Sequence, residues 1–406
     1  MEKLFGVTAT GLVILLGACS GPSSSSKAST EAVDLSYQDI LLTQLIDAKP
    51  GDVIEIPEGT YNFDRSLSLT VDGVTIRGAG MDKTVLSFKG QVSGAEGLLV
   101  TASNFTIEAI AIEDTVGDAI KVNEGDNIVF RNVRTEWTNG PSTKNGAYGL
   151  YPVQTTNVLI EGCVAIAAAD AGIYVGQSSN VIVRNNRAEQ NVAGIEIENT
   201  QHADVYNNVT VNNTGGILVF NMPNLTQYGS DVRVYDNEVY ENNTRNFGHK
   251  GTPVAAIPAG SGIVINSHDR IEIFNNNIRD NNTANIIISS VFTSDNAPNG
   301  MEETFDPYPE QISIHGNKLS GGGAKPDGFD LKALKTMMFG LKGSFPDVLW
   351  DGYVNVDIAD PKICIDQDGV EILNADMPNK NKNPRVEDIF TCEIEKLAPV
   401  KLVHNG

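Results

Sequence analysis

Six side chains in the middle of the sequence have types and spacings that suit acid–base chemistry: Lys121, Tyr148, Tyr151, Tyr174, Glu196 and Glu198. A lysine beside a tyrosine could move the proton α to a carboxylate, because a lysine removed from water has a lowered pKa and can also neutralise a carboxylate. The other two tyrosines could stack on sugar rings. Glu196 and Glu198 would lie about 7 Å apart along a strand, within the range for inverting glycoside hydrolysis.

Each of these residues also has a plain structural interpretation. A lysine on an outward strand face is usually solvated, aromatic side chains on neighbouring strands pack on one another, and two exposed acids on a strand are common. We assign the catalytic role to Lys121 and Tyr148. Substrate binding is assigned to Tyr151, Tyr174, Glu196 and Glu198.

The candidate residues belong to an internal repeat. A four-residue pattern, small–Ile/Leu–x–Val/Ile, begins at Ala119, Gly149, Gly172, Gly194, Gly216, Gly262 and Asn285. The spacings are 30, 23, 22, 22, 46 and 23 residues, so the base period is 22–23. A second short alternating segment keeps step with the first and ends near an asparagine each time, as in "NVIVRNN". Both segments are typical of short β-strands.

A period of 22–23 residues fits one turn of a right-handed parallel β-helix, in which each turn stacks on the next. Leucine-rich repeats would show LxxLxL, which is absent, and propeller blades need about 40–45 residues. Asparagine doublets recur at 185–186, 207–208 and 275–276. We interpret them as a stacked structural ladder at one corner, because asparagine tolerates the backbone of such corners.

The pattern also predicts which side chains point outward. Ile and Val of the four-residue pattern should point inward, and the x residue and the one two positions later should point outward. Irregular insertions at 138–145, 221–230 and 244–260 flank the same strand. Since function concentrates in such loops, we predict a groove along this strand, polar near Lys121–Glu198 and more apolar beyond.

The ends of the chain predict processing and caps. An apolar run from Leu4 to Leu16 is too short to span a membrane, and it ends in Leu-Gly-Ala-Cys19 before a serine-rich stretch. That order resembles the lipobox of bacterial lipoproteins, which implies a signal peptide at 1–18, lipidation of Cys19 and a tether at 19–35. The simpler reading is an ordinary secretory signal. Residues 36–323 should form the β-helix behind an N-terminal helix capped by Ser36, and 324–406 an irregular α+β C-terminal cap or small domain.

The net charge restricts the class of binding partner, and the cysteines predict one disulfide. The formal net charge is −22, which argues against nucleic acid because that partner needs a basic surface. Cys163 lies in an apolar run and should be a buried small hydrophobe. Cys364 and Cys392 remain, and in an exported chain they predict a disulfide. No nucleotide loop, serine triad, HExxH or redox CxxC is present, so no cofactor is evident and bridging Ca²⁺ is the ion left open.

Three stretches resemble known families. The helix followed by "PGDVIEIPEGTY" is similar to the N-terminal cap of the pectate-lyase-like superfamily, and the whole layout resembles a family of bacterial parallel β-helix repeat lipoproteins, a resemblance that implies no particular reaction. Tyr148-Gly149-Leu150-Tyr151-Pro152-Val153 resembles the Y-G-F-D-P-H motif of mannuronan C5-epimerases. Tyr148, Gly149 and Pro152 match that motif, whereas Tyr151 and Val153 stand where it has Asp and His. The resemblance implies a site lined for sugar. The alternative for Pro152 is a strand end after a loop insertion.

We therefore expect an all-β, right-handed parallel β-helix in the cell envelope, held by its lipid anchor alone, at the outer membrane in a Gram-negative cell. We expect a monomer that binds a uronate-containing polysaccharide and modifies it by elimination or C5 epimerisation. The alternative is a non-catalytic carbohydrate- or protein-binding scaffold lipoprotein whose partner is an envelope protein.

Overall fold

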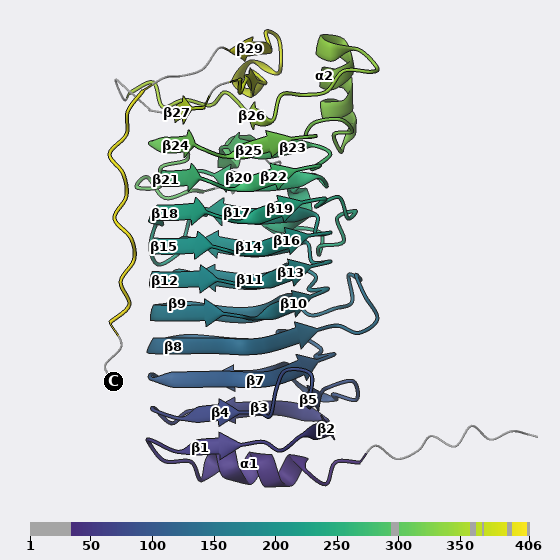
Figure 1. The fold of residues 1–406 in the computed structure, drawn as a ribbon, viewed down its shortest axis with the longest axis vertical. Coiled ribbons are helices and arrows are strands. Elements are labelled where there is room, and N and C mark those ends of the chain that lie inside the picture. The colour runs from purple at the N-terminus through teal and green to yellow at the C-terminus, as the bar shows by residue number, and fades with distance from the viewer. Residues whose placement is uncertain (1–33, 294–299, 358–362, 368, 388–391, 404–406) are drawn as a thin grey trace, which may run out of the picture. The chain divides into compact units, whose positions relative to one another are not determined.

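Three stacks of parallel strands wind around one axis, and each turn of the chain contributes one strand to each stack (Figure 1). The structure is a computed structural model that describes residues 34–293, 300–357, 363–367, 369–387 and 392–403. The expected signal peptide, lipidation site Cys19 and nearly all of the tether lie outside these residues. Within the described residues, no helix is both long and apolar enough to cross a membrane.

The strands follow the order stack I, stack II, stack III in each turn up to β26, and between β27 and β28 the described residues add no strand to stack II. Stack I contains β1 (Val53–Glu55), β4 (Thr75–Arg77), β12 (Ser179–Arg184), β15 (Gln201–Tyr206), β18 (Ser230–Tyr235), β21 (Asp269–Phe274), β24 (Ile312–His315) and β27 (Ile363–Asp366). Stack II contains β2 (Gly59–Asn62), β5 (Thr84–Ser87), β10 (Val164–Ile166), β13 (Arg187–Glu189), β16 (Val209–Val211), β19 (Glu238–Tyr240), β22 (Asn277–Arg279) and β25 (Lys318–Ser320). Stack III contains β3 (Arg65–Leu69), β6 (Ser93–Val100), β11 (Ala171–Gly176), β14 (Ala193–Glu198), β17 (Gly215–Phe220), β20 (Ser261–Asn266), β23 (Ala284–Ser289), β26 (Val348–Trp350) and β28 (Ile372–Asn374).

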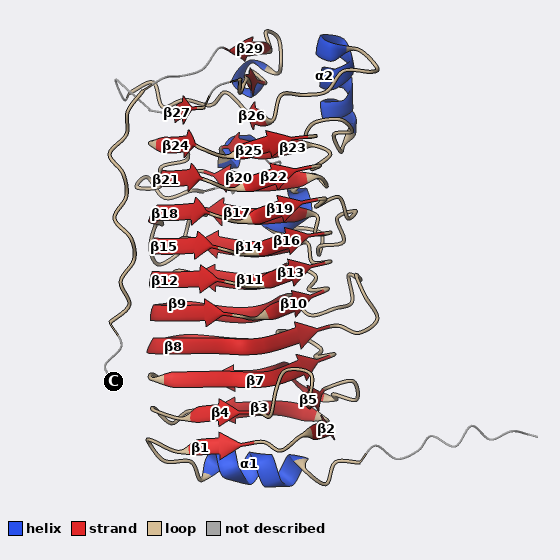
Figure 2. Cartoon of the chain, in the orientation of Figure 1, coloured by secondary structure: helices blue, strands red, loops and turns tan. Residues whose placement is uncertain are grey.

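Three long strands bend through a corner and serve more than one stack. β7 (Phe105–Glu113) joins stacks I and II, β8 (Ile120–Glu136) joins all three, and β9 (Tyr148–Glu161) joins stacks III and I. Figure 2 shows that strands, joined by loops, make up most of the regular secondary structure of the described chain. The predicted all-β solenoid fold is confirmed.

The alternation of the repeat explains the core. Ile173 and Val175 of β11 are fully buried, and Ile173 pairs with Ile195 on the next turn. Inward Ile, Val and Leu from all three stacks form one continuous apolar core. At one end α1 (Gln38–Ile46) covers this core with Leu41 and Leu45. Its N-cap is Tyr37, with no capping side-chain bond, so the expected Ser36 cap was off by one residue.

The asparagine doublets form the predicted ladder. The second residue of each doublet is buried, and so are the asparagines at the same corner of other turns. Each side-chain Nδ2 donates to a backbone carbonyl of the turn before and to the next asparagine at 2.9–3.0 Å: Asn186, Asn208, Asn237 and Asn276, with Asn317 as the last acceptor. The first residue of each doublet adopts a left-handed backbone, with φ of 57°, 54° and 56° at Asn185, Asn207 and Asn275. A parallel ladder of Asn191, Asn213, Asn242 and Asn281 lies at another corner.

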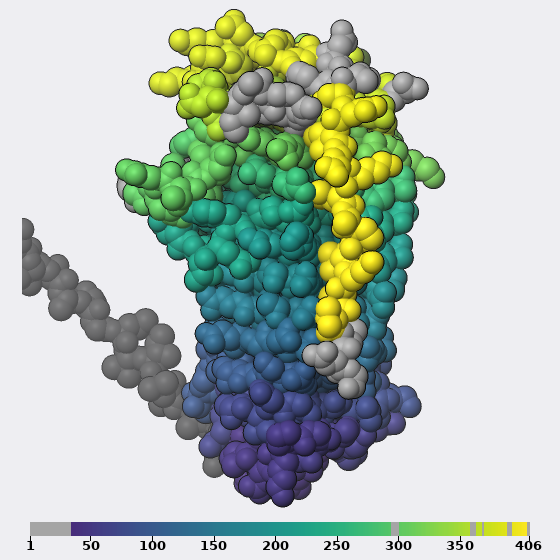
Figure 3. Space-filling view, turned by 90° about the vertical axis from the view of Figure 1, so that its left-hand side faces the viewer, coloured from purple at the N-terminus to yellow at the C-terminus, as the bar shows by residue number. Residues whose placement is uncertain are grey.

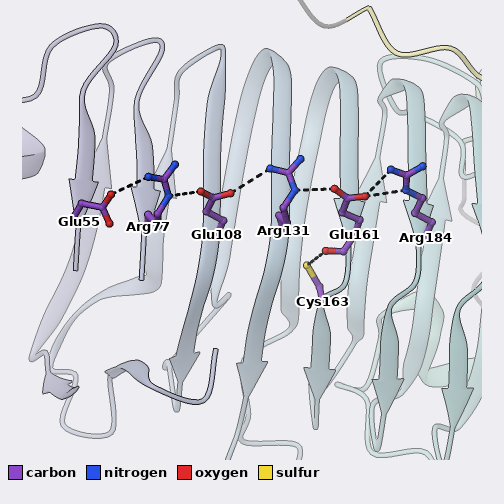
Figure 4. Close-up of polar contacts among 7 residues, drawn as sticks. All are labelled: Glu55, Arg77, Glu108, Arg131, Glu161, Cys163 and Arg184. Atoms are coloured by element: carbon purple, nitrogen blue, oxygen red, sulfur yellow. Dashed lines mark hydrogen bonds and ion pairs between the residues drawn. The ribbon is translucent and has the colours of Figure 1, made fainter. Parts of the chain in front are cut away.

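The outer face of stack I carries a second kind of ladder. Acidic and basic side chains alternate over six turns, with nitrogen–oxygen contacts of 2.5–3.3 Å: Glu55, Arg77, Glu108, Arg131, Glu161 and Arg184 (Figure 4). The column continues through the parallel rings of Tyr206, Tyr235, Phe274 and His315, stacked at 4.7–5.2 Å. Because such ion pairs at a surface contribute little each, the ladder mainly fixes the register between turns.

The C-terminal cap continues the stacking past residue 323. β26 pairs with β23 and β27 with β24, while β29 (Arg385–Glu387) adds antiparallel to β28. α2 (Phe329–Phe339) packs beside this end of stack III, and short 3₁₀ turns η1 (Pro253–Ala256), η2 (Val291–Thr293) and η3 (Met377–Asn379) lie in the connections. A disulfide joins Cys364 and Cys392. From there the chain runs back along the outside of the solenoid, yellow in Figure 3, where the backbone N–H of Val400 donates to Asp204.

Candidate functional site

The six candidate residues lie on the outer side of stack III, on strands β8, β9, β11 and β14. The register places Lys121 beside Tyr151, Tyr174 beside Glu196 and Gly176 beside Glu198. The 30-residue spacing between the first two turns is absorbed by the loop before β9, where the sequence pattern put the insertion. Neighbouring turns therefore bring the six side chains onto one face of stack III, with Lys121, Tyr151, Tyr174 and Glu196 in one column.

Three tyrosine rings form the centre of the site. Tyr148 lies 4.5 Å from Tyr151 and 4.6 Å from Tyr174, centroid to centroid, and Tyr151 meets Tyr174 edge to face at 4.9 Å. The Nζ atom of Lys121 lies 4.8 Å from the centroid of the Tyr151 ring. Lys121 thus contacts Tyr151. We expected Lys121 to lie beside Tyr148, and the Tyr151 ring contacts both of them.

Two aspartates complete the site, and the sequence analysis missed both. Asp118 accepts a hydrogen bond from the backbone N–H of Tyr148 at 3.3 Å. Asp170 interacts with the Tyr148 side chain, which favours its ionised form. Each stands one or two residues before the small residue that opens the four-residue pattern, as Tyr148 does. That position was the available signal, because it lies at the edge of the same strand and on the same side.

Burial makes the acids of this site hard to ionise. Loss of water raises the pKa of Asp118 to about 6, against the opposing pull of Lys121. Loss of water, and then repulsion from Glu198 and Asp118, raises the pKa of Asp170 to about 8. The pKa of Glu196 is raised well above its ordinary value for the same reasons, with Asp170 and Glu198 as the repelling charges. Acidic groups with strongly shifted pKa values are concentrated at functional sites.

The hydrogen bonding of these acids is incomplete. Glu198 accepts a hydrogen bond from the Tyr174 hydroxyl at 2.7 Å, and burial is the main cause that raises its pKa. One oxygen of Asp170 and one of Glu196 have no hydrogen-bond partner within the described residues, although these residues are only 5% and 1% exposed. Buried polar atoms are nearly always paired, so the two oxygens are available to a ligand or to water.

The outward face is more covered than the sequence pattern predicts. Tyr174 is 4% exposed and belongs to a second apolar cluster with Val254 and Leu218, while Phe247 and Tyr148 pack against its edge. Val254 and Phe247 come from the insertion at 244–260. We expected this insertion to wall a groove, and it instead lies over the column, so that Tyr174 and Glu196 are buried. Lys121, Tyr148, Tyr151 and Glu198 remain partly exposed.

Tyr148 is restricted to one of the two roles that its type allows. Burial, followed by the charges of Asp170 and Glu196, raises the pKa of Tyr148 far above its ordinary value. The hydroxyl therefore keeps its proton at any physiological pH and can donate it but cannot serve as the resting base. Asp118, whose pKa is about 6, is mostly ionised at neutral pH and is the better placed proton acceptor.

Two other residues with potentially reactive side chains lie apart from this site. His268 is fully buried, which lowers its pKa to about 4, and Cys163 is buried as expected. Within the part of the chain that the structure describes, no three or more His, Cys, Asp or Glu side chains are arranged to hold a metal ion.

Comparison with solved structures supports the fold. The A-module of mannuronan C-5 epimerase AlgE4 from Azotobacter vinelandii is 17% identical, with a TM-score of 0.53 over 84% of this chain and 91% of that one. The AlgE6 A-module of the same organism is 16% identical, with a TM-score of 0.51 over 83% and 89%. The catalytic unit of a GH87 α-1,3-glucanase from Streptomyces thermodiastaticus is 16% identical, with a TM-score of 0.50 over 83% and 52%. At these identities the likeness concerns the fold.

The sequence itself gives a family. No curated protein matches the chain. The family model described as "Right handed beta helix region" matches residues 68–224 and 142–299, which together make up more than half of the chain. These ranges cover the strands from β3 into β23 and include the whole candidate site. The chain therefore belongs to the right-handed β-helix family.

Proposed function

We propose that the protein binds a uronate-containing polysaccharide on the outer face of stack III and modifies it by elimination or C5 epimerisation. The observation that carries the proposal is the buried group of acids and tyrosines that opens toward Lys121. The fold neighbours named above include two enzymes that epimerise mannuronan and one that acts on an α-1,3-glucan. They support the carbohydrate class, and the residues of this chain carry the choice of reaction.

The roles follow from charge and pKa. Lys121 would neutralise the uronate carboxylate, which makes the proton at C5 more acidic. Asp118, ionised at neutral pH because its pKa is about 6, would take that proton. Tyr148, which keeps its proton, would donate it: to the glycosidic oxygen as the C4–O bond breaks in elimination, or to the opposite face of C5 in epimerisation. Acid and base then stand on the same strand stack, one turn apart.

Asp170 and the remaining residues would position these groups. With a pKa of about 8, Asp170 is mostly protonated at neutral pH, so a neutral acid rather than a charge faces the anionic sugar. Tyr151 would supply a ring face and Glu198 would hold a hydroxyl group. Tyr174 and Glu196, which are buried, would act from beneath them, Tyr174 through its hydrogen bond to Glu198. The turnover number divided by KM should rise as the pH passes about 6 and fall as it passes about 8, because Asp118 must be ionised and Asp170 protonated.

The second candidate function is a non-catalytic carbohydrate- or protein-binding scaffold of the cell envelope. It is favoured by the burial of Tyr174 and Glu196 beneath the insertion and by Tyr151 and Val153, which stand where the epimerase motif has Asp and His. Such a protein would bind polymer without changing it.

The test is turnover of uronate polymers by the purified chain. Mannuronan, mixed alginate and polygalacturonate would be incubated with and without Ca²⁺. Ultraviolet absorbance reports the unsaturated product of elimination, proton NMR reports epimerisation, and reducing ends without absorbance report hydrolysis. Lys121→Ala and Tyr148→Phe should abolish turnover. Lys83→Ala, an exposed lysine of another stack, is the matched control. Binding without any product would support the scaffold and contradict the enzyme.

The cellular setting is a separate proposal. We propose that Cys19 is acylated and that this lipid holds the mature monomer in the envelope, at the outer membrane of a Gram-negative cell. Cys19→Ser should accumulate an unprocessed precursor without diacylglycerol. Normal cleavage and normal membrane fractionation of that variant would contradict the anchor and leave the proposed reaction unaffected.

A further inference from the structure

A cavity of about 480 Å³ lies on stack III beyond the candidate site, toward the C-terminal cap. It is distinct from the acid and tyrosine site, and none of the six candidate residues lines it. Cavities of this size hold small organic ligands. The repeat explains its position, because its floor continues the outward column that carries Lys121 and Tyr151 farther up the chain.

The floor is apolar. Phe220, Val264, Ile287 and Leu349 come from four successive strands of stack III, β17, β20, β23 and β26, and all line the cavity. Because these are outward positions of the β-helix, they would be solvated on a bare solenoid. They are at most 8% exposed here, since other parts of the chain cover them.

Two separate segments form the roof. One is η1 with the residues that follow it, from the insertion at 244–260, and the other is the start of α2. Asp327 joins them, because its carboxylate accepts a hydrogen bond from the backbone N–H of Ala259 at 3.2 Å and its own N–H donates to Thr283 at 2.9 Å. The two roof segments, which are distant in sequence, are thus joined by a direct hydrogen bond.

Every charged side chain that lines the cavity is acidic. These are Asp327, Asp330 and Asp351, and no Lys, Arg or His is among the lining residues. Asp351 is buried and accepts hydrogen bonds from Ser290 and Thr293. Asp327 has a distant ion pair with Lys332, at 3.9 Å. The side chain of Asp330 is exposed at the rim and makes no hydrogen bond or ion pair within the described residues. Its carboxylate is therefore free for a ligand.

We propose that this cavity binds a small organic cation with an apolar body. The body would contact the floor at Phe220, Val264 and Ile287. The charged group would face Asp330 and Asp327 at the rim. A molecule with a net charge of −22 adds a favourable long-range field for a cation. A uronate would be repelled, so this ligand class differs from that of the proposed polysaccharide site.

The experiment uses three probes of similar size that differ in charge: phenethylamine, 2-phenylethanol and 3-phenylpropanoate. Binding to the purified chain would be measured by calorimetry at neutral pH and low salt. We expect saturable binding of the amine, at least several-fold weaker binding of the alcohol and none of the carboxylate. Asp330→Asn should weaken amine binding by about two- to five-fold, the effect of an exposed ion pair. Asp366→Asn, an exposed aspartate of the cap outside the cavity, should not change it.

A blocking variant locates the site. Ala256 lies on η1, is exposed and lines the cavity, so Ala256→Trp can fill the space without altering the solenoid core. It should abolish amine binding while leaving the circular dichroism spectrum and melting temperature close to those of the parent. Equal binding of all three probes, no binding of the amine, or unchanged amine binding by Ala256→Trp would each overturn the proposal. None of these readouts depends on polysaccharide turnover.

Discussion

Replacement of Asp170 by asparagine should stabilise the protein while removing the activity that we propose. Asp170 is 5% exposed, interacts with the Tyr148 side chain and has one oxygen without a hydrogen-bond partner in the described residues. An asparagine keeps the shape and an acceptor for Tyr148, and its NH₂ group could donate to the neighbouring acids. The asparagine side chain does not ionise, so the substitution removes the free-energy cost of keeping Asp170 protonated in the folded state.

The magnitude follows from linkage. The ordinary pKa of Asp170 is 3.8, and in the folded protein it is raised to about 8. Below pH 3.8 both states are protonated. Between pH 3.8 and about 8 the unfolded chain ionises while the folded chain keeps its proton, so the free energy of unfolding falls as the pH rises. One pKa unit corresponds to about 1.4 kcal/mol, which makes the loss on the order of 4 kcal/mol at pH 7.

The assay is urea unfolding of the parent and Asp170→Asn at several pH values between 4 and 8, with Asp366→Asn as the exposed control. The stability difference between Asp170→Asn and the parent should be small at pH 4 and grow toward pH 8, whereas Asp366→Asn should show no such trend. If Asp170→Asn is less stable than the parent throughout, or if the difference is independent of pH, then burial does not hold the proton on Asp170 and the assignment of acid and base collapses.

Three further predictions concern the scaffold. Asn208→Ala should lower the free energy of unfolding by about 4 kcal/mol, because it removes four buried hydrogen bonds of about 1 kcal/mol each. Asn207→Gly should change it by less than about 1 kcal/mol, because φ at that position is 54° and suits glycine. Similar values for the two variants in urea unfolding would argue against the ladder. Ile173→Ala should cost about 2–5 kcal/mol as a fully buried position, and a silent variant would mean that the strand faces are exchanged. Peptide mapping without reductant should find Cys364 linked to Cys392, and two free thiols would contradict the bridge.

The fold could be predicted because every turn of a solenoid has the same geometry and therefore requires the same pattern of residues. Side chains alternate with period two along each strand, and the turn repeats every 22–23 residues. The pairing of Ile173 with Ile195 on the next turn therefore follows from their spacing in the sequence. The Asn185–Asn186 doublet was equally readable, because one corner needs a left-handed residue followed by a buried amide. Both the alternation along a strand and the asparagine doublet depend on interactions within a turn and between adjacent turns. They can be recognised in the sequence because the turn is repeated many times.

The site was predictable only in part because it depends on contacts that no repeat encodes. Register gave the column from Lys121 to Glu198, but Asp118 and Asp170 lie just outside the four-residue pattern and were passed over. The burial of the column depends on how the insertion at 244–260 packs against stack III. The length and composition of the insertion do not specify this packing. A long loop can wall a groove or lie across it with the same sequence pattern.

The insertion also explains why one stack carries two different sites. A parallel β-helix exposes each outward column to water, and an apolar column such as Leu218, Val264 and Ile287 would then be an open hydrophobic patch. Covering it with the insertion and α2 removes that patch, and the same cover takes water from the acids beside it. Desolvation is the first cause of the raised pKa of Asp170 and Glu196. Shortening the insertion should therefore expose the apolar floor and, at the same time, lower both pKa values.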